Sequence, residues 1–186
     1  MRLFHVSEES NITQFVPRTP LRNDLDKSKG LVWAINEYCL PNFLTPRDCP
    51  RVTYYASDKT TENDISRFFS SSSRHCLAIE HAWYGRMQNT ALYLYEFDPS
   101  NFYLQDEVAG YYVSEHTETP IGKTEINDSF GELFKRNIEI RLVNNLWDLA
   151  DAVVKSSLSF SICDMANARP RVARREQAPA LPYVKL

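Results

Sequence analysis

The sequence predicts an α+β fold, on the evidence of its composition and of the order of its apolar patterns. It has 186 residues, of which 43% are hydrophobic and 24% charged, values typical of a globular domain that folds unaided. Strand-type and helix-type patterns alternate irregularly, which favours α+β over a doubly wound parallel sheet. We therefore expect one α+β domain at residues 1–166, followed by a basic tail at 167–186.

The first strands are predicted from short apolar runs. Arg2–Val6 alternates apolar and polar side chains, and residues 7–30, rich in Ser, Asn, Asp and Pro, are typical of a loop. Leu31–Ile35 is a continuous apolar run, as in a strand buried on both faces. Prolines limit the next segment to a short helical turn at Tyr38–Leu44, and a third strand is expected at Arg51–Ala56.

A first helix is predicted after the third strand. Thr61 followed by Asp64 resembles a helix N-cap. Three apolar residues then share one helical face: Ile65, Phe68 and Phe69. Beyond the serine run that ends this helix, we expect a brief strand at Leu77–Ile79 and a helix through Met87.

The second half of the chain contains the strongest strand pattern, Ala91–Asp98. Further strands are expected at Ala109–Ser114 and Ile138–Val143. A helix between them is predicted with Asn127 as its cap and three residues facing inward: Phe130, Leu133 and Phe134. A last amphipathic helix is predicted at Leu146–Ser157.

Several classes of protein are disfavoured by what the sequence lacks. The first residues are not followed by an apolar stretch of signal-peptide length, and no segment reaches membrane-spanning length, so we expect a cytoplasmic protein with no membrane partner. The cysteines show no zinc-type spacing and are expected to be reduced: Cys39, Cys49, Cys76 and Cys163. Walker, Rossmann, HExxH and GxSxG motifs are absent, which argues against P-loop hydrolases and the usual dinucleotide oxidoreductases.

The histidines do not predict a metal site. His75 and His81 lie near Cys76 and Glu80, but they lack the helical i, i+4 spacing of paired ligands. We therefore expect surface histidines and no bound metal.

Charge is uneven along the chain. Residues 1–166 carry sixteen basic against twenty-three acidic residues, whereas 167–186 carry five basic and one acidic. Such a tail is typical of a solvated terminus, and it is also compatible with phosphate contacts. The basic tail and the many tyrosines make single-stranded nucleic acid a possible partner. This partner is less favoured because residues 1–166 carry a net negative charge.

Pro46–Val52, with the sequence PRDCPRV, has the features of a rigid binding element. Its Arg47 and Arg51, with Arg18, are able to clamp a pyrophosphate, because guanidinium groups recognise phosphate bidentately. An alternative is that either arginine of the segment pairs with Asp48 to brace the turn. Cys49 is either a nucleophile activated by these arginines or a structural thiol.

Three short segments resemble motifs of the ADP-ribosyltransferase superfamily. Leu3–Ser7 (LFHVS) is similar to its first-strand histidine motif, Gly30–Ala34 (GLVWA) to its second strand, and Tyr111–Ser114 (YYVS) to the strand of its third motif. The resemblance implies a split sheet of mixed and antiparallel strands with several short helices, and NAD as cofactor. It implies that His5 holds a ribose hydroxyl and that Trp33 or Phe43 stacks on nicotinamide.

The resemblance also implies a glutamate that orients the substrate, and the sequence departs from it there. Tyr111 stands at that position, and a phenol does not replace an acceptor-only carboxylate. Glu107 and Glu115 are the nearby substitutes, of which we select Glu115. The expected catalytic residues are His5, Glu115 and Tyr111. The expected cofactor-binding residues are His5, Val6, Ser7, Arg18, Trp33, Arg47, Arg51, Tyr55 and Tyr112.

Over a longer span, Phe4–Asn167 resembles an uncharacterised bacterial protein family in which FHVSEE, PRDCPRV and LYLYEFD recur. Taken together, these features predict an NAD-binding, ADP-ribosyltransferase-like enzyme with an atypical catalytic triad. The alternatives are a non-catalytic module for a nucleotide or another small ligand, and a binder of single-stranded nucleic acid. The acceptor substrate is left open.

Overall fold

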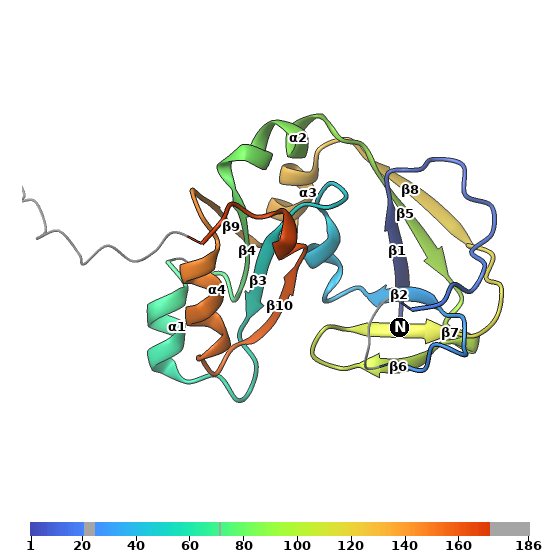
Figure 1. The fold of residues 1–186 in the computed structure, drawn as a ribbon, viewed down its shortest axis with the longest axis horizontal. Coiled ribbons are helices and arrows are strands. Elements are labelled where there is room, and N and C mark those ends of the chain that lie inside the picture. The colour runs from blue at the N-terminus through green and yellow to red at the C-terminus, as the bar shows by residue number, and fades with distance from the viewer. Residues whose placement is uncertain (21–24, 71, 172–186) are drawn as a thin grey trace, which may run out of the picture.

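The computed structural model describes residues 1–20, 25–70 and 72–171, which form two β-sheets with short helices (Figure 1). The first sheet is antiparallel, with the order β6-β7-β2-β1-β5-β8. Its strands are β1 (Leu3–Ser7), β2 (Val32–Asn36), β5 (Leu92–Phe97), β6 (Tyr103–Asp106), β7 (Tyr111–Ser114) and β8 (Gly122–Ile126). The predicted α+β class is thereby confirmed.

The second sheet is mixed, with the order β10-β3-β4-β9, in which only β4 and β9 run parallel. Its strands are β3 (Arg51–Tyr55), β4 (His75–Glu80), β9 (Glu139–Val143) and β10 (Ser159–Cys163). Two helices, α1 (Glu62–Phe68) and α4 (Trp147–Val154), lie side by side against its outer face (Figure 1). Their apolar side chains cover Val52, Tyr54, Cys76 and Ala78.

The main core lies between the two sheets. Phe4 and Ile35 of the antiparallel sheet meet Leu77 and Ile79 of the mixed sheet there, and all four side chains are buried. Two more helices lie near this core, α2 (Tyr84–Asn89) and α3 (Ser129–Lys135). The short helices are η1 (Leu40–Phe43), η2 (His81–Trp83), η3 (Pro99–Asn101) and η4 (Met165–Asn167).

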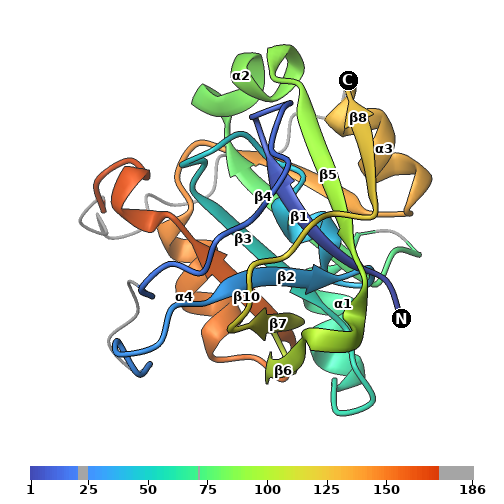
Figure 2. The same cartoon turned by 90° about the vertical axis from the view of Figure 1, so that its right-hand side faces the viewer.

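The opposite face of the antiparallel sheet carries a smaller core. Leu3, Val32, Ala34 and Phe97 are buried there, with Phe15 packed against them. Figure 2 shows the segments after β1 and between β7 and β8 crossing this face. They are joined by paired backbone hydrogen bonds between Phe15 and Glu118 (2.8 and 3.0 Å), so the sheet is covered on both sides.

Several local predictions are confirmed and others are corrected. Thr61 caps α1 by accepting a hydrogen bond from the Asp64 amide, as expected. The cap of α3 is Asp128 and not Asn127, and Phe134 is 64% exposed instead of facing inward. His75 is buried and not at the surface, since it begins the central strand β4.

Three strands were not predicted. β6 is an edge strand of four residues, and β8 has four exposed residues of its five, so neither displays the apolar alternation of a half-buried strand. β10, with the sequence SFSIC, does alternate polar and apolar residues, and sequence reasoning missed it. Within the described residues, no helix has the length and apolar composition needed to cross a bilayer.

The folded domain extends past the predicted boundary at residue 166. The Arg169 amide donates to both oxygens of the buried Glu80 carboxylate (3.1 Å each), and the Trp147 indole N–H donates to the Arg169 carbonyl (2.8 Å). Arg171 lies over the Trp147 ring (4.3 Å) and pairs with Asp151. The rest of the predicted tail, 172–186, lies outside the described residues.

Candidate functional site

The candidate site begins where β1 and β2 separate. Their pairing covers only Leu3 with Asn36 and Phe4 with Ile35. At the position after Phe4, the His5 side chain makes the contact with β2 that the backbone no longer makes. Its Nδ1 lies 3.0 Å from the Trp33 carbonyl oxygen. A carbonyl only accepts hydrogen bonds, so Nδ1 carries the proton in this contact.

The His5 ring is held in the neutral form. Burial lowers the pKa of His5, the Trp33 hydrogen bond partly offsets this, and the positive charges of Arg18 and Arg47 lower it further. Neutral imidazole with a proton on Nδ1 leaves Nε2 as an acceptor. Within the described part of the chain Nε2 has no hydrogen-bond partner, so it is available to a donor such as a ligand hydroxyl.

Two arginine side chains near His5 are weakly engaged. Arg18 is exposed, and only its backbone is paired, with Leu31. The Arg47 guanidinium has Glu9 as its ion-pair partner, at a long 3.9 Å, and its side chain is 61% exposed. The structure thus brings together three predicted cofactor-binding residues: a neutral imidazole and two guanidinium groups, of which only that of Arg47 has an ion pair in the described chain, a long one with Glu9.

A pocket adjoins this group at the end of β1. We call it the Arg51 pocket; its volume is about 220 Å³. It is lined by Val6, Ser7 and Glu8 from the end of β1, by Phe43, Thr45, Pro46, Arg47, Asp48 and Arg51, and by Leu92 and Asp164. Four predicted cofactor-binding residues are therefore among its walls: Val6, Ser7, Arg47 and Arg51.

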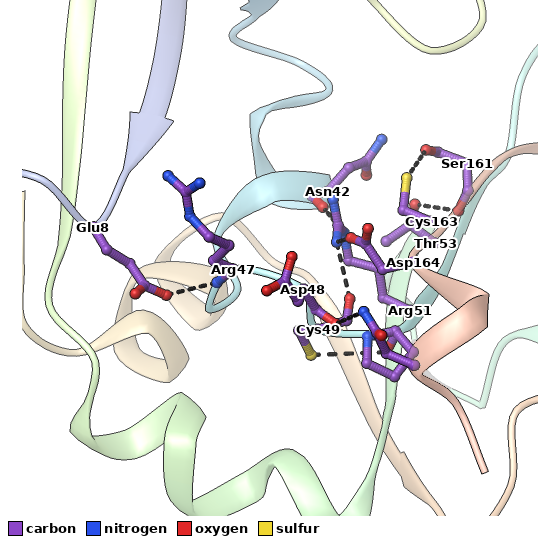
Figure 3. A network of polar contacts seen from close by, with 12 residues as sticks. Glu8, Asn42, Arg47, Asp48, Cys49, Arg51, Thr53, Ser161, Cys163 and Asp164 are labelled. Atoms are coloured by element: carbon purple, nitrogen blue, oxygen red, sulfur yellow. Dashed lines mark hydrogen bonds and ion pairs between the residues drawn. The ribbon is translucent and has the colours of Figure 1, made fainter. Parts of the chain in front are cut away.

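Arg51 is the fixed centre of the pocket wall (Figure 3). Its Nε donates to the Asn42 carbonyl (2.6 Å), and its Nη1 donates to the Cys49 carbonyl (2.9 Å) and to the Asp164 carboxylate (2.7 Å). Its guanidinium also lies 4.8 Å from the centre of the Phe43 ring. Among the described contacts neither Arg47 nor Arg51 pairs with Asp48, so the brace considered from the sequence is replaced by the pair with Asp164.

Two residues of this wall, from distant parts of the chain, have an unusual backbone conformation. Asp48 and Asp164 both have positive φ, 64° and 56°, a region that non-glycine residues rarely occupy. Cys49, which follows Asp48, is buried, and burial raises the pKa of its thiol to about 12. Cys49 is therefore a structural thiol and not an activated nucleophile.

The predicted aromatic residues fall on both faces of the antiparallel sheet. Trp33 and Tyr111 lie on the inner face, with ring centres 5.4 Å apart, and Phe43 lies 5.8 Å from Tyr111. Tyr112 is on the opposite face, which it shares with His5. Tyr55 is buried in the core with its hydroxyl bonded to the Val108 carbonyl, so the structure does not bring it to the pocket.

Two glutamates after β7 differ in their surroundings. Glu115 is at the surface, where Lys29 (2.8 Å) and Tyr103 (3.1 Å) donate to its carboxylate and lower its pKa. Glu118, which sequence reasoning missed, is 7% exposed and accepts from the Ser114 hydroxyl (2.5 Å). No apolar pattern surrounds Glu118, so nothing in the sequence signals its burial.

Glu118 is tied to the His5 region through Phe15. The backbones of Phe15 and Glu118 are paired, and the Phe15 ring lies 4.7 Å from the His5 ring, centre to centre. The second oxygen of the Glu118 carboxylate has no hydrogen-bond partner in the described residues. A buried carboxylate with one free oxygen therefore lies on the same face of the sheet as His5.

A metal-binding cluster is not found in the described ranges, in which no three His, Cys, Asp or Glu side chains are grouped to hold an ion. The buried His75 has another role. Its Nε2 lies 2.9 Å from the Asn42 amide oxygen, and burial lowers its pKa to about 4.

Comparison with known proteins identifies the family. Searches of curated proteins and of solved structures found no match. A family model described as "Family of unknown function (DUF6886)" matches residues 4–168, nearly the whole of the described chain. The protein therefore belongs to the DUF6886 family.

Proposed function

We propose that the chain binds NAD or a related dinucleotide at His5 and acts as an ADP-ribosyltransferase-like enzyme. The carrying observation is the neutral His5 ring, whose Nδ1 is engaged by the Trp33 carbonyl and whose Nε2 is a free acceptor. A ribose hydroxyl is a suitable donor to Nε2. The motif resemblance of the first, second and seventh strands supports the same ligand.

The two arginines supply the charge that a dinucleotide needs. Arg18 and Arg47 both lie close enough to His5 to lower its pKa, and neither has a short ion pair in the described structure. Guanidinium groups bind phosphate oxygens in a planar, bidentate manner. We assign the pyrophosphate to these two side chains and not to Arg51, whose guanidinium is held by three protein acceptors.

Tyr112 is the aromatic residue best placed for the nicotinamide ring. It pairs with Ala34 across β2 and β7, and its ring packs on the face of the antiparallel sheet that also carries His5. Trp33, on the other face, is less suitable.

Glu118 is our candidate for the orienting carboxylate. Cleavage of the ribosyl–nicotinamide bond develops positive charge on the sugar, and a fixed carboxylate stabilises that charge. Glu118 is buried on the His5 face, whereas Glu115 is exposed and already paired with Lys29. The catalytic role of Glu115 stays a prediction from the sequence. Comparing the activities of variants at Glu115 and Glu118 tests which carboxylate orients the substrate.

The proposal is tested by calorimetric titration of the full chain with NAD, followed by an assay for free nicotinamide. We expect binding that is weakened at least tenfold in His5→Ala and unchanged in His81→Ala, which alters an exposed histidine outside the site. Binding with nicotinamide release supports the enzyme, and binding without release supports the non-catalytic module. No binding at about 1 mM NAD, a free energy of only about −4 kcal/mol, rejects the proposal.

A further inference from the structure

The Arg51 pocket is too small for a dinucleotide. Its volume of about 220 Å³ corresponds to about seven water molecules at roughly 30 Å³ each. Whole cofactor sites usually occupy at least about 300 Å³. The pocket therefore fits a small molecule, and what that molecule is can be inferred from the polar groups in its wall.

Two lining residues, each largely buried, have a donor that makes no hydrogen bond to the described residues. Arg51 is 5% exposed, and its Nε and Nη1 are bonded, while Nη2 makes no hydrogen bond in the described chain. Thr45 is 6% exposed, and its hydroxyl has no partner among the described residues. Both residues line the pocket, so a carboxylate bound there would accept hydrogen bonds from both side chains.

The outer wall carries negative charge. Glu8 and Asp48 are exposed, and Glu8 uses one carboxylate oxygen to accept from the Arg47 amide (2.6 Å). The Asp48 carboxylate has no partner within the described ranges, and Figure 3 shows the Arg47 side chain directed away from the Arg51 network. The lining thus includes three carboxylates, Glu8, Asp48 and Asp164, and only Asp164 is paired with Arg51, so the charge of the pocket disfavours a simple anion.

We propose that the Arg51 pocket binds a compact zwitterion of the free α-amino-acid type. The carboxylate of the ligand accepts from Arg51 Nη2 and the Thr45 hydroxyl, and its ammonium group pairs with Asp48 and Glu8. This arrangement gives the two donors and the two exposed carboxylates partners in one small molecule. The inference does not depend on the nucleotide proposal, because it involves neither His5 nor Arg18.

The test is calorimetric titration of the full chain with L-alanine, and separately with acetate and methylammonium, which each carry half of the ligand's charge pattern. We expect L-alanine to bind at least tenfold more tightly than either half. Asp48→Asn removes the negative charge and tolerates a positive φ. This variant is expected to weaken L-alanine binding about fivefold, the upper range for an exposed ion pair, and to leave acetate binding unchanged or stronger.

Glu62→Gln is the matched control, since it removes an exposed carboxylate of α1 outside the pocket, and it is expected to bind L-alanine like the parent. Arg51→Lys keeps the charge but removes Nη2, and a normal unfolding curve shows whether it has folded. If Arg51→Lys does not fold, the proposal is tested with Asp48→Asn alone. Equal affinity for acetate and L-alanine, or no L-alanine binding at about 10 mM, overturns the proposal. NAD titration of the same sample shows whether the nucleotide proposal stands or fails separately.

Discussion

His75 shows how one buried side chain couples stability to pH. Its folded pKa is about 4, below the usual value of about 6.5, because burial disfavours the charged ring. The unfolded chain therefore binds more protons between these values, and stability falls as pH drops from about 6.5 to about 4. The full effect is about 3 kcal/mol.

We expect His75→Gln, which keeps an N–H donor for Asn42 but does not titrate, to flatten this pH dependence. Urea unfolding at several pH values between 7 and 4 measures it. His81→Gln, at an exposed position, serves as the control and should retain the slope of the parent. His5 also has a lowered pKa, so a shallower slope remains. An unchanged slope in His75→Gln contradicts the assignment.

The two glutamates after β7 allow a second prediction for single residues. Glu118→Gln keeps an acceptor for the Ser114 hydroxyl and removes the charge, so NAD binding should change little. Nicotinamide release should fall about a hundredfold, as when a preorganised electrostatic group is lost. Glu115→Gln is expected to stay within twofold of the parent. The reverse ranking, measured in the same release assay, would restore Glu115 as the catalytic carboxylate.

At the scale of elements, α1 depends on its cap. The Thr61 hydroxyl accepts from the Asp64 amide (3.2 Å), which satisfies one of the unpaired donors of the first turn. Thr61→Ala should lower the free energy of unfolding by about 1 kcal/mol, and Thr61→Ser should restore most of it. Denaturant unfolding measures both variants. Equal stability of the alanine and serine variants would show that the hydroxyl does not cap the helix.

For the whole molecule, the last described residues close the domain over a buried charge. Glu80 is 1% exposed, and the described contacts of its carboxylate are with the Arg169 amide. A chain ending at Ala168 leaves that carboxylate without its donor, so we expect a loss of about 1–3 kcal/mol. A chain ending at Arg171 is the matched control and should keep the parent's stability in denaturant unfolding. Equal stability of both truncations would contradict this role.

Much of the fold was predictable because local patterns and tertiary burial agree along most strands. β1, β2, β3 and β5 carry apolar residues dense enough to identify each strand. β8 was missed because its side chains are mostly exposed, and only pairing with β5 makes it a strand. Its existence is a property of the sheet and not of its own composition.

The sequence by itself determined the α+β class and pointed to His5, Arg18, Arg47 and Arg51, because strand ends and proline-stiffened turns present side chains in recognisable ways. Only the tertiary structure decided which of those residues are held by the protein's own hydrogen bonds and which are available to a ligand. Hydrogen bonds between distant segments hold Arg51 in the wall, whereas the Arg47 guanidinium has only a long ion pair with Glu9. The burial of Glu118 likewise depends on its pairing with Phe15, about a hundred residues away in the chain, and no local pattern encodes such a contact.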